Sequence, residues 1–217
     1  PRNSTDKREG EMVTLKWGLA NSNNWISAYL MSKLNPYALA RLIHSFGVRN
    51  KEIQPTVSLC LGPCEISVGE MVSAYTAFAN KGIRVAPLFV TKIEDSEGNV
   101  LATFSPQMEE VISASSAYKM LVMLRAVINE GTGGRVRRYG ITADMGGKTG
   151  TTNRNSDGWF MGFTPSLVHK VYADQTLGYD PKETFNLPDG FDPCKDFSIS
   201  GDSIIDEPES GLDDLFN

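Results

Sequence analysis

The chain has 217 residues, of which 41% are hydrophobic, and a formal net charge of −5 at pH 7. This length suffices to bury one hydrophobic core, and the acidic balance argues against nucleic acid as a partner. No apolar run approaches the ~20 residues of a membrane-spanning helix. Because the first residue is Pro1 and no signal peptide is visible, we expect the chain to be a piece of a longer protein.

Cysteine and histidine are sparse. The cysteines are Cys60, Cys64 and Cys194, an odd number without Cys-x-x-Cys spacing, which argues against a zinc site and against a disulfide scaffold. His44 and His169 lie too far apart in sequence to suggest a local metal site. We therefore expect neither a metal ion nor a cofactor.

Short helices separated by polar breaks are predicted in the first half of the chain. They are expected over residues 13–20, 25–34, 37–46 and 69–80. The first break, Asn21–Asn24, contains side chains that hydrogen-bond to nearby backbone groups instead of continuing a helix. Pro36 suits the first turn of the third helix, and Ser67 with Glu70 has the spacing of a capping box for the fourth. Residues 51–66 are expected to form a loop.

The second half predicts mixed structure. A hairpin is expected from segments 88–93 and 99–104, then an amphipathic helix from Ser113 to just before Gly131. Further expectations are a mobile turn at 131–134 and a solvated loop with three arginines at 135–138. Two short strands at 148–152 and 159–163 are joined by a polar turn at 153–157, and an acidic, disordered tail is expected at 201–217.

The strongest chemical signal is the string Lys148-Thr149-Gly150-Thr151, which follows a double glycine. Gly150 lets a ligand approach an extended backbone closely. Lys148 supplies a cation, and the two threonine hydroxyls can hold a carboxylate. The backbone N–H of Thr151 can donate to a developing oxyanion. A Lys-Thr-Gly triplet alone is a weak signal.

A second signal is Ser22-Asn23-Asn24, in the break between the first two helices. Ser22 offers a hydroxyl that can relay protons, and Asn24 offers an amide that can hold a peptide group. On its own this is an ordinary helix-breaking turn. Together with the lysine string, however, it matches the second and third elements of the serine acyl-transferase set S-x-x-K, S-x-N and K-T-G.

The surrounding sequence resembles the transpeptidase domain of class A penicillin-binding proteins. The resemblance extends from about Val13 to Val168. It rests on ordered blocks at residues 18–24, 61–67, 70–75, 78–82, 147–152 and 157–165.

This resemblance implies an α+β fold of the serine β-lactamase and transpeptidase type, with an antiparallel sheet flanked by helices and incomplete in this chain. The implied activity is peptidoglycan cross-linking: a serine attacks a D-Ala-D-Ala stem peptide, releases D-Ala and passes the acyl group to an amine. β-Lactams acylate the same serine. The implied location is the periplasmic face of the inner membrane, with an anchor outside this chain.

The resemblance also assigns roles to residues. Ser22 would relay a proton, Asn24 would hold the substrate amide, and Lys148 would polarise the site. Thr149 and Thr151 would bind the carboxylate, and Gly150 would leave room for the ligand. It further implies an oxidising compartment in which Cys60 and Cys64 could pair; two free, partly buried thiols are the equal alternative.

The chain departs from the family pattern in two places. The nucleophile motif is absent, because Ser4–Lys7 lies too close to Ser22 and Ser116–Lys119 follows it. We expect the missing N-terminal portion to supply that motif, and this chain alone to be inactive. The resemblance also stops after Val168, where we expect that a segment of the family pattern is missing. The expected organisation is a partial transpeptidase domain, a C-terminal region and the acidic tail, at residues 1–168, 169–200 and 201–217.

Three other interpretations stay open. A serine β-lactamase or a small D-Ala-D-Ala carboxypeptidase shares the motif set, although the spacing of 126 residues between Ser22 and Lys148 suits the transpeptidases better. A penicillin-sensing domain would bind without turnover. A generic interaction domain, in which both motifs are coincidental turns, requires that Ser22 and Lys148 lie far apart in space.

Overall fold

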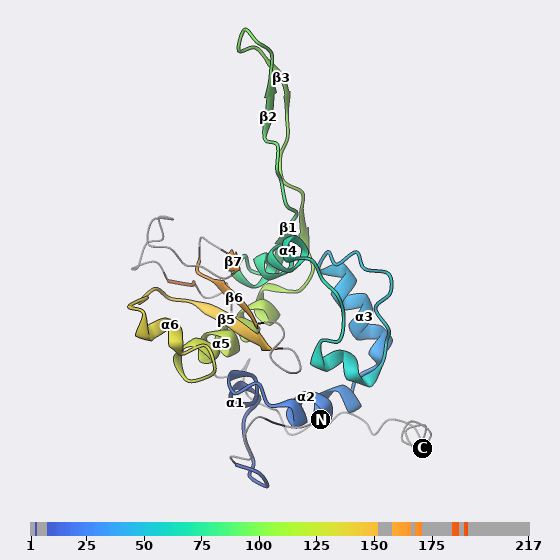
Figure 1. Ribbon diagram of the computed structural model, residues 1–217, viewed down its shortest axis with the longest axis vertical. Helices are drawn as coiled ribbons and strands as arrows, with labels where there is room; N and C mark the ends of the chain where they lie inside the picture. Colours follow the sequence, from blue (N-terminus) through green and yellow to red (C-terminus); the bar gives the residue numbers. More distant parts are fainter. Residues whose placement is uncertain are drawn as a thin grey trace.

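The computed structural model describes residue 3 and residues 8–151, 158–165, 168–170, 184–186 and 189–190. The described residues form helices and three small antiparallel sheets (Figure 1). Several predictions lie outside the described residues: the Ser4–Lys7 string, the turn at 153–157, the acidic tail at 201–217 and the state of Cys194.

Three helices open the chain, as predicted: α1 Leu15–Ala20, α2 Asn24–Ser32 and α3 Pro36–Ser45. Each begins after a side chain that accepts a backbone N–H from its first turn. The capping residues are Thr14, Asn23 and Asn35. Because such a cap satisfies one of the orphan N–H groups of a helix, local sequence fixes where all three begin.

Part of the predicted loop at 51–66 is helical. A 3-10 helix, η1 Val57–Leu61, packs against α2 and α3. It buries Leu59 beside Met31 from α2 in a first core cluster that also contains Ala40, Val48 and Ile53. The expectation of a plain loop was therefore wrong at this point, because burial of one leucine holds the turn in place.

Cys60 and Cys64 are both free, half-buried thiols. The Sγ of Cys60 donates to the Val57 carbonyl oxygen at 3.2 Å. Burial raises the pKa of both thiols above its ordinary value, which reduces their thiolate fraction at neutral pH. Of the two alternatives, the structure therefore has the unpaired one.

Helices α4 Val68–Ala79 and α5 Ala114–Asn129 form the centre of the fold. The capping box at α4 is present, with the Ser67 hydroxyl accepting from the Glu70 N–H and the Glu70 carboxylate accepting from the Ser67 N–H. A second core cluster joins α5 to the sheet through Phe163, which is completely buried. Burial raises the pKa of Tyr75, on α4, to about 12.

A long hairpin projects from the body between α4 and α5 (Figure 1). The predicted pairing of its outer part is confirmed, since β2 Lys92–Glu94 lies antiparallel to β3 Val100–Thr103. A second pair at its base, β1 Ile83–Val85 and β4 Met108–Glu110, was not predicted.

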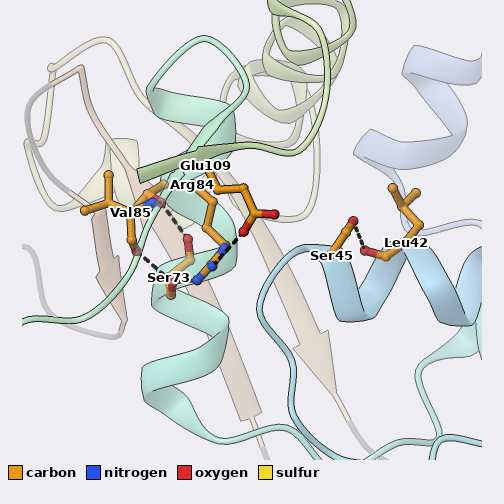
Figure 2. Close-up of polar contacts among 7 residues, drawn as sticks. Leu42, Ser45, Ser73, Arg84, Val85 and Glu109 are labelled. Atoms are coloured by element: carbon orange, nitrogen blue, oxygen red, sulfur yellow. Dashed lines mark hydrogen bonds and ion pairs between the residues drawn. The ribbon is translucent and has the colours of Figure 1, made fainter. Parts of the chain in front are cut away.

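The base of the hairpin is fastened to α4 by a polar cluster (Figure 2). The buried Ser73 hydroxyl donates to the Val85 carbonyl oxygen at 2.7 Å and accepts from Arg84 Nη1 at 3.3 Å. Arg84 Nη2 pairs with Glu109 at 3.2 Å. These contacts join α4, β1 and β4 into one unit.

The arginine segment after α5 is a short helix, α6 Arg135–Arg138, and not the solvated loop that was predicted. The Arg137 guanidinium donates to the carbonyl oxygens of Ile141 and Ala143 at 2.9 and 2.8 Å, and to Asn129 Oδ1. Arg137 thus satisfies backbone acceptors of the turn that leads into the next strand.

The main sheet has the order β5-β6-β7, from β5 Gly146–Thr151, β6 Gly158–Phe163 and β7 Val168–Lys170. All pairs are antiparallel. The two predicted strands are confirmed, and β7 forms where the family pattern breaks off. Helix α5 packs on β5, and α4 packs on β6 and β7. An ion pair between Arg125 and Asp144 at 2.7 Å ties α5 to the start of β5.

This architecture confirms an α+β fold with antiparallel strands flanked by helices. Among the described residues, no helix combines the length and apolar character required to cross a membrane.

Candidate active site

Ser22 lies immediately after α1 in a tight helix ending. Its N–H donates to the Leu19 carbonyl at 3.1 Å, and the N–H of Asn23 donates to the Gly18 carbonyl at 2.9 Å. This pair of bonds is a Schellman motif, whose central residue must be left-handed and is usually glycine. Ser22 has a φ of 51°, a conformation that costs an L-residue of order 1–3 kcal/mol. A strained serine at a glycine position points to a use for its side chain.

The backbone of the S-x-N segment is held from both sides. The Asn23 side chain accepts from the Ile26 N–H and so begins α2. The N–H of Asn24 donates to Asn3 Oδ1 at 2.8 Å. The role of the Asn24 side chain as the substrate amide holder stays a prediction.

Lys148 lies on β5, and its ammonium Nζ donates a hydrogen bond to Ser22 Oγ. It also donates to the Thr149 carbonyl oxygen at 2.9 Å. Burial lowers the pKa of Lys148 below its ordinary value, because desolvation disfavours the ammonium. The expected convergence of two motifs separated by 126 positions is therefore confirmed.

This hydrogen bond determines what the Ser22 hydroxyl can do. An ammonium group can only donate, so Ser22 Oγ accepts from Lys148 and its own proton stays available to another acceptor. The adjacent cation also stabilises negative charge that develops on Oγ when the proton leaves. The pair has the chemistry of a proton relay.

The double glycine before Lys148 is explained by packing. A Cβ at Gly146 would lie 2.6 Å from Cζ of Phe163, and one at Gly147 would lie 2.7 Å from the Met161 carbonyl oxygen. Both glycines let β5 press against β6 directly over the core. Lys148 is thereby fixed at the position where the strand leaves the core.

The strand that carries Lys148 has only one neighbouring strand among the described residues. β5 is at the edge of its sheet, so within the described residues no strand pairs with its second side. Gly150 and Thr151 are exposed there. Such an edge can accept an extended peptide. The Thr151 N–H as an oxyanion donor stays a prediction.

Thr132 joins the two motifs, a contact that sequence reasoning missed. The turn at Gly131–Gly134 was predicted to be mobile, yet the Thr132 N–H donates to the Ala20 carbonyl at 3.0 Å. Its Oγ1 lies 2.7 Å from Thr149 Oγ1. Three glycines around one threonine could have signalled a close backbone approach.

Two surface pockets lie elsewhere in the fold. One is between α4, α5 and the segment at 184–186, and the other is between α3, α4 and the hairpin base. Neither includes Ser22 or Lys148 among its lining residues. Within the described ranges, no group of three or more potential metal-ligating side chains occurs. The Ser22–Lys148 pair is therefore the candidate site on chemical grounds.

Sequence comparisons identify a family for most of the chain. Residues 2–182 match the family described as the penicillin binding protein transpeptidase domain. Penicillin-binding protein 1A from Aquifex aeolicus is 36% identical over 184 residues, and that from Neisseria meningitidis is 34% identical over 185 residues. These matches cover 85% and 83% of this chain but only 24% and 22% of the relatives. The chain thus spans about a quarter of their length.

Solved structures give the same result. A crystal structure of penicillin-binding protein 1A from Haemophilus influenzae matches with a TM-score of 0.69 and 27% identity, over 75% of this chain and 30% of that one. PonA1 from Mycobacterium tuberculosis, in complex with penicillin V, matches with a TM-score of 0.60 and 28% identity, over 74% and 48%. The sequence match over most of its length and the shared fold show that this chain belongs to the penicillin-binding protein transpeptidase domain family.

Proposed function

We propose that this chain supplies part of the active site of a serine-type peptidoglycan D,D-transpeptidase that is also a penicillin target. The observation that carries the proposal is the hydrogen bond from Lys148 to Ser22, since it joins two of the three motifs of this chemistry. The donor substrate is a D-Ala-D-Ala stem peptide. β-Lactams act as its mimics.

In this mechanism each residue of the site has a defined task. An attacking serine Oγ adds to the penultimate D-Ala carbonyl and gives up its proton. Ser22 relays that proton to the nitrogen of the terminal D-Ala, which leaves as an amine when its C–N bond breaks. Lys148 stabilises the charge on the Ser22 oxygen during that transfer. Thr149 and Thr151 hold the terminal carboxylate, Asn24 holds the peptide amide, and an acceptor amine then releases the acyl group from the serine.

The attacking serine is proposed to come from a segment of the longer protein that precedes residue 1. The S-x-x-K string at Ser116–Lys119 is an unsuitable alternative, because it follows Ser22 in the chain and so reverses the order of the motifs. The same longer protein would carry the membrane anchor and place this domain on the periplasmic side of the inner membrane. Its partners there are peptidoglycan stem peptides.

The first test is labelling with a fluorescent penicillin. The full-length protein is expected to form one covalent adduct per molecule, and peptide mapping by mass spectrometry should locate it on a serine that precedes residue 1. The 217-residue chain alone is expected to form none. An adduct on Ser4 or Ser116 would contradict the assignment of the motifs.

Turnover separates a transpeptidase from a penicillin sensor. With a stem peptide as donor and an amine as acceptor, the full-length protein should release D-Ala and form the cross-linked product. A sensor would be acylated by penicillin without forming that product.

The pH dependence of acylation tests the charge on Lys148. Because burial lowers its pKa, the ammonium is lost at a lower pH than for an exposed lysine. The acylation rate should therefore fall on the alkaline side with a midpoint below the ordinary lysine pKa. The measurement is the second-order rate constant for benzylpenicillin at closely spaced pH values.

Lys148→Arg is the control for this profile, because a guanidinium does not lose its proton in proteins. Whatever its absolute rate, this variant should lack the alkaline fall that belongs to residue 148. An identical alkaline midpoint in both proteins would assign the fall to a different group.

A further inference from the structure

The S-x-N and K-T-G segments are linked by a second connection besides the Ser22–Lys148 bond, and it passes through Thr132. Its N–H donates to the carbonyl oxygen of Ala20, two residues before Ser22. Its side-chain oxygen lies 2.7 Å from that of Thr149, directly after Lys148. These contacts form a closed circuit, which runs from Ser22 through Lys148, Thr149 and Thr132 to the end of α1.

The backbone approach that permits this circuit is very close. A Cβ at Gly131 would lie 2.1 Å from the Ala20 carbonyl oxygen, closer than any real contact. On the other side of the threonine, Gly133 is buried, and its N–H donates to the Val127 carbonyl at 2.9 Å. The turn is therefore fastened both to the end of α1 and to the end of α5, and Thr132 is held between them.

Counting protons gives the Thr132–Thr149 bond a direction. A carboxylate can only accept hydrogen bonds, and a threonine hydroxyl has one proton to donate. When Thr149 donates that proton to a ligand carboxylate, the bond between the two hydroxyls needs its proton from Thr132. Such a chain of donors polarises each hydroxyl in turn and strengthens the terminal bond.

We propose that Thr132 is a positioning residue for carboxylate recognition: it donates to Thr149 Oγ1 and thereby directs the Thr149 proton to the carboxylate of the stem peptide or β-lactam. This inference rests on the proposed function. It adds a fourth segment, the turn between α5 and α6, to the three motifs of the site. Thr132 is an exposed residue, and its hydroxyl lies beside that of Thr149, where the ligand carboxylate is expected.

The test uses the full-length protein, with benzylpenicillin and its methyl ester as probes. The ester lacks the negative charge, so a hydrogen bond from the oriented proton is much weaker than with the acid. Thr132→Val removes the hydroxyl at nearly constant volume and should slow acylation by the acid about three- to tenfold, the usual effect of one lost hydrogen bond. With the ester as probe, Thr132→Val should be acylated at nearly the wild-type rate.

Conservative and coupled variants complete the test. Thr132→Ser keeps the hydroxyl and should restore the wild-type rate, and Thr132→Ala provides a second hydroxyl-free variant. The double change with Thr149→Val should be no slower than Thr149→Val alone, because both remove the same interaction. Thr103→Val, an exposed threonine on the hairpin, is the matched control and should leave the rate unchanged.

Two results would overturn the inference. Equal losses for the acid and the ester would mean that Thr132 acts only through the fold, and an unchanged rate in both hydroxyl-free variants would remove it from the site. Failure of the proposed function is a different result, in which wild-type protein is not acylated or Lys148→Ala is acylated normally.

Discussion

Lys148→Ala is expected to slow acylation of the full-length protein by benzylpenicillin about 10²- to 10⁴-fold, the usual effect of removing one group that acts on charge or a proton in the transition state. The ammonium is the hydrogen-bond donor to Ser22 Oγ, and alanine removes this cation from the Ser22 oxygen. Ser22→Ala should fall in the same range, because it removes the relay itself. The measurement is the rate of adduct formation in quenched-flow samples.

Folding should be almost unaffected by Lys148→Ala. The side chain is half-buried and its ammonium is desolvated, so removing it costs few contacts and relieves a desolvation penalty. Lys51→Ala, at an exposed turn, is the matched control and should be acylated at the wild-type rate. An acylation rate within a few-fold of wild type, together with a clear drop in melting temperature, would mean that Lys148 is a structural residue.

Phe163→Ala is expected to lower the free energy of unfolding by about 3–5 kcal/mol, as for other buried aromatic residues. Phe163 has no exposed surface and packs against Leu121 and Leu124 of α5. Its ring lies 6.1 Å from Tyr75 and 5.8 Å from Phe185, measured between centroids. One side chain thus connects α4, α5 and the sheet.

The loss can be measured as the shift of the urea midpoint followed by tryptophan fluorescence. Phe89→Ala makes the same chemical change on the hairpin, where Phe89 is 92% exposed, and should shift the midpoint very little. Equal shifts in the two variants would contradict the assignment of Phe163 to the core.

Local signals in the sequence predicted most of the helices. Their starts at Thr14, Asn23, Asn35 and Ser67 depend on single capping side chains, which are visible without any tertiary information. The outer part of the hairpin and the strands β5 and β6 were predicted in the same way, from turn residues and apolar spacing.

What the sequence did not reveal depends on distant contacts. Strands β1 and β4 lie at the base of the hairpin, where Arg84 donates to the Ser73 hydroxyl of α4, a contact that local sequence does not reveal. The arginine cluster looked solvated because the carbonyl acceptors of Arg137 come from a turn whose shape local sequence does not determine.

The candidate site shows the same division. Ser22 and Lys148 were identified because their residue types and order match a chemical pattern. Thr132 was missed because its significance lies in two contacts, one with Ala20 and one with Thr149, which lie 112 and 17 positions away. Only the three-dimensional arrangement assigns it to the site.

The long sequence separation of the Ser22–Lys148 pair has a consequence for folding. The hydrogen bond closes a loop of 126 residues, and α5 packs both on α1, which precedes Ser22, and on β5, which carries Lys148. Contacts of such high order carry a large loop-closure entropy, so we expect this one to form late in folding. Partly folded chains therefore contain both motifs but not the pair, so a covalent penicillin label marks the molecules in which this domain has finished folding.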